Sequence, residues 1–155
     1  WLTEPDLLKP SLIFLTLWGF GTSMLVFLAG LQAIPKDYYE AASMDGASPW
    51  RQFQSITLPL LSPTTLFVFI TKLIGAFQIF SSVYVLSGGT TVGGPQDAAL
   101  FVVPYLYNLG FKLGRFGYAS AVAWVLTLII MALTLLSMRL TERYVYYETT
   151  AEGRD

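Results

Sequence analysis

The sequence contains no cysteine and no histidine, and charged residues make up only 12% of its 155 residues. Without thiols or imidazoles, the chain has no thiolate nucleophile, no disulfide, no imidazole base and no Cys/His metal site. Its formal net charge of −1 leaves no basic surface for nucleic acid. These absences exclude the commonest enzyme and zinc chemistries, so we expect no catalysis, no metal and no cofactor of its own.

The few charges are clustered, and long uncharged stretches separate them. A soluble domain carries about 25% charged residues, twice the share found here. A helix needs about 20 apolar residues to cross the hydrocarbon of a bilayer. Stretches of at least that length without a charge cover residues 10–35, 52–71, 73–96 and 116–138. We therefore predict an all-α fold, a multi-pass transmembrane helical bundle.

Three helices are predicted to span the membrane, over residues 11–33, 62–86 and 117–140. Pro10 and Pro35 flank the first span, because proline suits the ends of a helix better than its interior. Gly19 and Ser23, four residues apart, give that span a strip of small residues for helix packing.

The segment 87–116 between the second and third spans is predicted to be an external loop. Its Gly and Pro content near 87–99 is typical of a loop, whereas 100–111 is apolar, aromatic and too short to cross. We expect an interfacial or re-entrant helix there, with Tyr105 and Tyr107 near the lipid headgroups. The polar tail 142–155 is expected to be frayed.

The connection 35–59, between the first two spans, has strong helix-boundary signals. Pro35 can open a short helix, which Gly46 can close in a left-handed conformation. Ser48 and Pro49 then provide the N-cap and first-turn proline of a second short helix. A connector between spans has no need of such an ordered elbow unless something docks on it.

The same connection resembles a known family motif. Glu40-Ala41-Ala42, followed at fixed spacing by Gly46, Ile56 and Leu58-Pro59, resembles the EAA loop of binding-protein-dependent ABC importer permeases. The chain is similar to the C-terminal portion of the carbohydrate-uptake branch, which includes maltose, lactose and glycerol-phosphate permeases. Stretches that carry this likeness are LWGFG (17–21), FLAGLQAIP (27–35), DGAS (45–48), FQIF (77–80), GGP (93–95) and GYASA (117–121).

The resemblance implies a permease subunit with a MetI-like transmembrane domain in a bacterial-type cytoplasmic (inner) membrane. In the family, the loop lies in the cytoplasm and docks on an ABC ATPase subunit, which binds the ATP. The resemblance also implies a second permease subunit, an extracytoplasmic solute-binding protein and a sugar or another polar solute. A plain surface helix with a solvated glutamate is the alternative interpretation of the motif. The residues that match the docking contacts are Glu40, Ala41, Ala42, Asp45 and Gly46.

Lys72 is a charge inside a predicted span, which by default suggests a functional site. It could line a solute pathway, reach toward an interface or form a salt bridge in the bundle. Gln78 could bond a hydroxylated solute or make a hydrogen bond between helices. Trp18, Phe77 and Phe80 could stack on sugar rings or simply pack within the bundle. An ion-coupled secondary transporter or channel that uses Lys72 is the competing function. A membrane anchor without transport activity is a third.

Overall fold

The computed structural model describes residues 4–88 and 93–141, and those residues form helices and no strand. The predicted all-α fold is confirmed. The frayed tail expected over 142–155 and residues 89–92 of the predicted external loop lie outside the described residues. The chain divides into two compact units, which comprise residues 4–20, 71–88 and 93–135 (unit 1) and residues 21–70 and 136–141 (unit 2).

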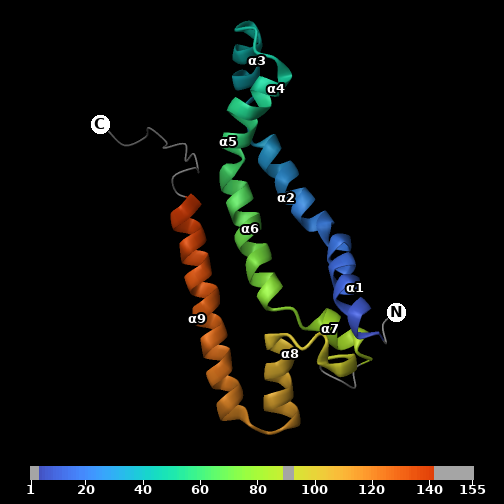
Figure 1. Cartoon of the computed structure of the whole chain (residues 1–155). Helices are drawn as coiled ribbons and strands as arrows, with labels where there is room; N and C mark the ends of the chain where they lie inside the picture. The colour runs from blue at the N-terminus through green and yellow to red at the C-terminus, as the bar shows by residue number, and fades with distance from the viewer. Residues whose placement is uncertain (1–3, 89–92, 142–155) are drawn as a thin grey trace, which may run out of the picture. The chain divides into compact units, whose positions relative to one another are not determined.

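The helices follow one another through short connections (Figure 1). In chain order they are α1 (Pro5–Trp18), α2 (Phe20–Gln32), α3 (Lys36–Met44), α4 (Pro49–Gln52), the π-helical η1 (Phe53–Thr57), α5 (Leu58–Leu60), α6 (Ser62–Phe77), α7 (Ser81–Leu86), the 3-10 helical η2 (Pro95–Asp97), α8 (Val102–Tyr107), the π-helical η3 (Asn108–Lys112) and α9 (Phe116–Thr141).

Within the described residues, two stretches are long and apolar enough to cross a membrane, Asp6–Gln32 and Phe116–Thr141. They overlap the predicted spans 11–33 and 117–140. A third candidate is the helix pair Pro49–Leu60 and Ser62–Phe77, which is bent by 58° at its break.

The first helix begins earlier than the sequence pattern suggested, and the prediction that Pro10 precedes it is wrong. Pro5 occupies the first turn of α1, where its missing N–H costs nothing, and Pro10 lies inside the helix. The extension is stabilised by packing, because Leu8 and Leu12 are 1% and 4% exposed in the core of unit 1.

The second predicted span, 62–86, is not one continuous helix. It stops at Phe77, and α7 restarts at Ser81 after Phe80 adopts φ −135° and ψ −60°. The break turns Val83 into the core of unit 1, where it is 1% exposed. A tertiary contact therefore overrides the apolar pattern that predicted an unbroken helix.

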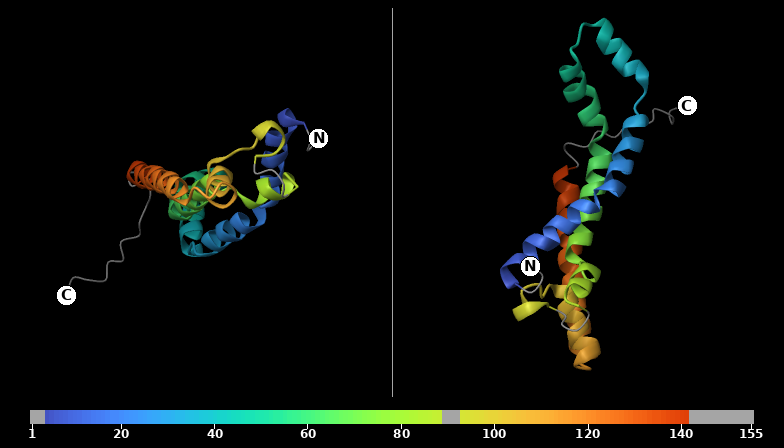
Figure 2. Two further views of the ribbon diagram at one scale, coloured as in Figure 1. Left: turned by 90° about the horizontal axis from the view of Figure 1, so that it is seen from below. Right: turned by 90° about the vertical axis from the view of Figure 1, so that its right-hand side faces the viewer.

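Unit 1 is organised around α1. Leu8, Leu12, Val83 and Ala99 form its buried core, and Figures 1 and 2 show α7 and the loop before α8 beside α1. A Cβ on Gly94, which has φ +71°, would lie 2.6 Å from Leu8 Cδ2. Gly94 therefore lets the loop backbone lie directly against α1.

In unit 2, α2 and α6 approach each other at a glycine. A Cβ on Gly30 would lie 2.8 Å from Thr64 Oγ1 and 3.0 Å from Leu61 Cδ2. Of the strip predicted from Gly19 and Ser23, Ser23 is buried, whereas a Cβ on Gly19 would meet only the Thr16 carbonyl of its own helix within the described residues. The close approach of two helices is thus at Gly30.

Candidate functional site

The predicted elbow is present in unit 2 as two helical limbs joined by a turn. Figure 2 shows α3 and α4 as the limbs of a hairpin. Ile34 is buried at the end of the preceding connection, and Pro35, with φ −60° and ψ 136°, leads into α3 at Lys36. The first limb therefore begins where the sequence predicted.

The first limb ends in a Schellman motif, the hydrogen-bonded turn that a left-handed glycine permits. The amide of Gly46 donates to the Ser43 carbonyl at 3.1 Å, and the amide of Ala47 donates to the Ala42 carbonyl at 2.9 Å. Gly46 has φ +74°, and a Cβ there would meet nothing within 4 Å in the part of the chain that the structure describes. The glycine is needed for its backbone conformation, not for space inside this chain.

The second limb begins with the predicted cap. The Ser48 hydroxyl accepts a hydrogen bond from the Arg51 amide at 3.4 Å, and Pro49 occupies the first turn. Trp50 stacks on Phe53, with ring centroids 5.7 Å apart. The helix was predicted to reach Ile56, and the helical backbone continues through η1 and α5 to Leu60.

A wide turn and a bend follow one another in the second limb. In η1 the Leu58 amide bonds to the Phe53 carbonyl, five residues back. Pro59 explains the widening, because its ring excludes the carbonyl of Ser55 from the usual position and it has no N–H to offer. The bend of 58° comes next. In a regular helix the Pro59 carbonyl would accept the amide of residue 63, but Pro63 has no N–H. The Ser62 hydroxyl donates to that carbonyl instead, at 2.6 Å.

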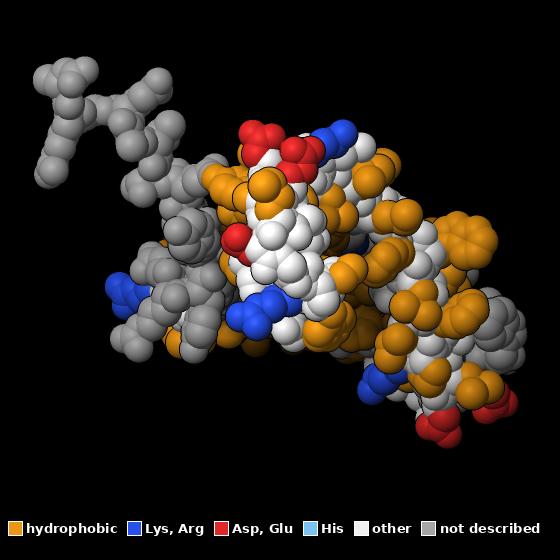
Figure 3. Space-filling view, turned by 90° about the horizontal axis from the view of Figure 1, so that it is seen from above, with side chains coloured by type: hydrophobic (Ala, Val, Ile, Leu, Met, Phe, Trp, Pro, Cys, Tyr) orange, Lys and Arg blue, Asp and Glu red, His pale blue; other side chains and the backbone are white. Residues whose placement is uncertain are grey.

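The five predicted docking residues lie together on α3 and the turn that follows it. Four of them are exposed, and Ala42 is partly buried. The side chain of Glu40 makes no hydrogen bond or ion pair with another described residue. Figure 3 looks onto this end of the chain, where acidic and basic side chains stand out among hydrophobic and polar ones. The elbow thus presents a small-residue surface with an available carboxylate.

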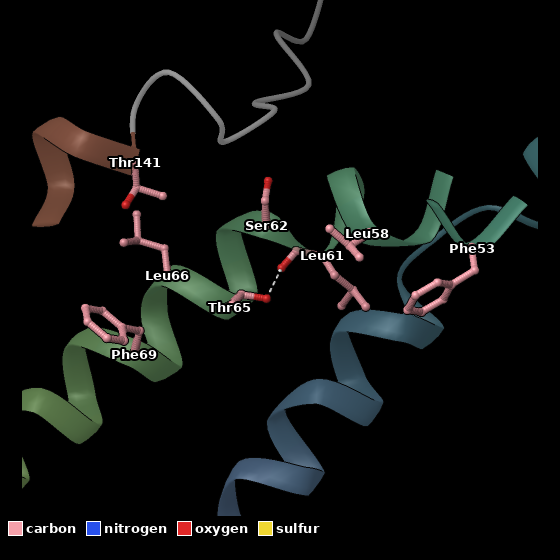
Figure 4. Close-up of a pocket in the computed structure, with 8 residues that line it drawn as sticks. All are labelled: Phe53, Leu58, Leu61, Ser62, Thr65, Leu66, Phe69 and Thr141. Carbon is pink, nitrogen blue, oxygen red and sulfur yellow. Dashed lines mark hydrogen bonds between the residues drawn. The ribbon is translucent and has the colours of Figure 1, made fainter. Parts of the chain in front are cut away.

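An apolar cavity of about 650 Å³ lies beside the bend (Figure 4). Among the described residues, the polar side chains that line it are hydroxyls, and the Thr65 hydroxyl already donates to the Leu61 carbonyl at 3.0 Å. The residues that line the cavity come from before and after the bend. On the side that faces the cavity, no described side chain packs against the bend. Its lining residues are Phe53, Leu58, Leu61, Ser62, Thr65, Leu66, Phe69 and Thr141.

The predicted solute-pathway residues all lie in unit 1, but the structure does not bring them into one site. Trp18 is 91% exposed, and Lys72 and Gln78 are exposed as well. Phe77 and Phe80 are partly buried. Among the described residues, no two of these five side chains share a hydrogen bond or a ring contact.

Sequence reasoning missed an aromatic cluster in unit 1. The rings of Phe80, Tyr84 and Tyr107 contact one another with centroids 5.1 to 5.8 Å apart. Phe111 stacks on Tyr107 at 5.2 Å, and Phe116 meets Phe111 edge-on at 5.9 Å. The sequence shows the aromatic residues of 100–111, but it does not show that they contact rings on α7 and α9. The cluster joins four helical segments, α7, α8, η3 and α9.

The family comparison covers most of the chain. A family model described as "Binding-protein-dependent transport system inner membrane component" matches residues 3–145. This range includes the elbow, the three candidate spans and the aromatic cluster.

Curated relatives are similar over nearly the same range. The probable ABC transporter permease protein YesP of Bacillus subtilis (strain 168) is 42% identical over 152 residues, which cover 98% of this chain and 48% of the relative. The lactose transport system permease protein LacF of Rhizobium radiobacter is 40% identical over 138 residues, with 88% and 46% covered. The chain thus spans about half the length of the curated relatives it matches.

A solved structure is similar in fold. It is a crystal structure of a bacterial alginate ABC transporter in complex with an alginate pentasaccharide-bound periplasmic protein. One of its chains matches with a TM-score of 0.69 and 25% identity, over 92% of this chain and 49% of that chain.

Proposed function

Because the chain belongs to the family of binding-protein-dependent transport system inner membrane components, we propose that it is part of a permease subunit of an ATP-driven importer for sugars or related polar solutes. The names of the relatives support a carbohydrate solute, since one is a lactose permease and a similar structure is an alginate transporter. The observation that carries the proposal is the exposed elbow. Glu40 lies on its first limb, and Gly46 lies in the turn that follows this limb.

The elbow docks on a cytoplasmic ATPase subunit, which binds and hydrolyses the ATP. Ala41, Ala42 and Gly46 offer little side chain, so a partner surface can approach the backbone closely. Glu40 is exposed and its side chain is unbonded within the described residues, so it can form a charge-assisted bond across the interface. Asp45 adds a second carboxylate at the turn.

Transport follows as a two-state change. ATP binding draws two such elbows together, one from this subunit and one from a second permease, and the packed helices switch between inward-facing and outward-facing states. The continuous helical path from the second limb into α5, followed by the bend before α6, supports this mechanism because it joins the elbow to a candidate span. An extracytoplasmic binding protein delivers the solute.

The solute pathway draws on Lys72, Gln78, Phe77, Phe80 and Trp18. In this proposal the elbow 35–59 faces the cytoplasm, the segment 87–116 lies outside, and the spans are 11–33, 62–86 with its break, and 117–140. Phe80 is the best supported aromatic candidate, since the aromatic cluster fixes one face of its ring.

The decisive experiment compares Glu40→Ala with Glu4→Ala in the complete transporter. Both residues are exposed glutamates, but Glu4 lies in unit 1, outside the elbow. Glu40→Ala should abolish co-purification of the ATPase and solute uptake, while Glu4→Ala leaves both unchanged. Lys72→Gln should leave ATPase binding intact.

Two outcomes contradict the proposal. If Glu40→Ala and Glu4→Ala behave alike, the elbow is not the docking site. If uptake continues without an ATPase and is lost on Lys72→Gln, the chain is an ion-coupled transporter or channel instead.

A further inference from the structure

A side-chain hydrogen bond joins the two limbs of the elbow away from the turn. The hydroxyls of Tyr39 on α3 and Thr57 at the end of η1 lie 2.8 Å apart. Thr57 is only 7% exposed, so water competes little for its hydroxyl. Eighteen residues separate the partners in sequence, and the bond therefore fixes the second limb against the first.

A second set of hydrogen bonds joins the limbs nearer the turn. Gln52 Nε2 donates to Ser43 Oγ at 2.9 Å and to the Ala47 carbonyl at 3.2 Å. The Ser43 hydroxyl in turn donates to the Tyr39 carbonyl at 2.7 Å. Hydrogen bonds at two heights restrain α3 from pivoting about the Gly46 turn, so we expect the elbow to move as one body.

Thr57 also stands at the start of the path to the bend. Its carbonyl accepts the Leu61 amide at 2.9 Å, and Leu61 is the residue between α5 and α6. The wide turn of η1 determines where the Thr57 side chain points, because one residue is added before α5 begins. The route from α3 to the bend thus runs through Tyr39, Thr57 and Leu61.

We infer that Tyr39 and Thr57 are a positioning pair, which transmits displacement of the docked α3 to the bend at Leu61. This inference rests on the proposed function, since it assumes that α3 is where the ATPase binds. Without the Tyr39–Thr57 hydrogen bond, α3 still docks, but part of its movement is absorbed within the elbow. Loss of the pair therefore uncouples ATP hydrolysis from transport and leaves docking intact.

The geometry is tested by spin-label distance measurements on the complete transporter. The 155 residues contain no cysteine, so in a transporter whose other cysteines are replaced, Lys36→Cys and Gln54→Cys place one label on each limb at exposed positions. We expect one narrow distance distribution in this background and in Thr57→Ser, which keeps the hydroxyl. Tyr39→Phe and Thr57→Val should broaden it. An unchanged distribution in both variants overturns the inference.

The functional test measures solute transported per ATP hydrolysed. Tyr39→Phe or Thr57→Val should lower this ratio about three- to tenfold, as expected for one lost side-chain hydrogen bond. The double variant should be no worse than either single variant, because both remove the same bond. Thr57→Ser should keep the ratio of the unmodified transporter, and the ATPase should co-purify with all of these variants.

Thr127→Val is the matched control, since the Thr127 hydroxyl donates at 2.9 Å to the Ala123 carbonyl of its own helix. If Tyr39→Phe and Thr57→Val transport as many solute molecules per ATP as Thr127→Val, the inference fails. That result differs from failure of the proposed function, in which Glu40→Ala would leave ATPase binding intact.

Discussion

Replacing Gly46 by alanine tests whether the elbow depends on one left-handed residue. Gly46 has φ +74°, a conformation that costs a residue with a Cβ about 1–2 kcal/mol. Apart from its two chain neighbours, no atom of the described residues lies within 4 Å of the added Cβ, so no steric clash with those residues adds to that figure. We expect Gly46→Ala to raise the opening equilibrium of the turn by roughly 5- to 30-fold.

Amide hydrogen exchange measures this equilibrium directly. The amides of residue 46 and Ala47 donate to the Ser43 and Ala42 carbonyls, and both hydrogen bonds break when the turn opens. Their exchange should accelerate by the same factor in Gly46→Ala. Gly46→Asn is the matched variant, because asparagine tolerates the left-handed region while carrying a larger side chain. Its exchange should stay closer to that of the unmodified chain.

Equal exchange rates for glycine, alanine and asparagine at position 46 would refute the claim that the turn needs a residue in the left-handed conformation. The same two variants also separate conformation from contact in the complete transporter. If the partner approaches the backbone closely, Gly46→Asn loses ATPase binding even though the turn is intact.

Three further substitutions test packing and capping. Gly30→Ala should destabilise unit 2 by about 1–3 kcal/mol, measured by thermal unfolding in detergent, because the new Cβ would lie 2.8 Å from Thr64 Oγ1. Leu8→Ala should cost about 2–5 kcal/mol in the same assay, since Leu8 is 1% exposed in the core of unit 1. Ser48→Ala should cost about 0.5–1 kcal/mol, seen as faster exchange of the Arg51 amide, because the capping bond is long at 3.4 Å.

Matched controls accompany the two packing variants. Gly21→Ala lies on the same helix as Gly30, but its Cβ would meet no described atom within 4 Å, so it should be neutral or stabilising. Leu7→Ala, at a position that is 48% exposed, should cost much less than Leu8→Ala. Equal losses within either pair would contradict the packing described for that unit.

The limbs of the elbow were predictable because their signals are local. Proline before a helix, glycine after it and the Ser48-Pro49 pair each act within one helical turn of where they stand. The wide turn of η1 was not predictable, because the clash between the Pro59 ring and the carbonyl four residues before it can be relieved in several ways. The Tyr39–Thr57 hydrogen bond depends on that choice, so it too is visible only in the structure.

Contacts between segments that are distant in the sequence account for the other differences between the predictions and the structure. Gly19 and Gly30 look alike in an apolar helix, and only the position of α6 distinguishes them. The break after Phe77 lets Val83 join Leu8 and Ala99 in one core, and Leu8 lies far from Val83 in the sequence. The predicted solute-pathway residues share only their chemical type, and the structure does not gather them at one point.

The interruption between α6 and α7 restricts the surroundings that this part of the chain can have. The amides of Ile79 and Phe80 donate to no carbonyl within the described residues, because they lie between two helices that do not share a hydrogen-bond ladder. An amide left without an acceptor in hydrocarbon costs several kcal/mol. Lipid tails therefore cannot solvate the chain at this point, and water or an oxygen atom from a neighbouring protein segment must reach it.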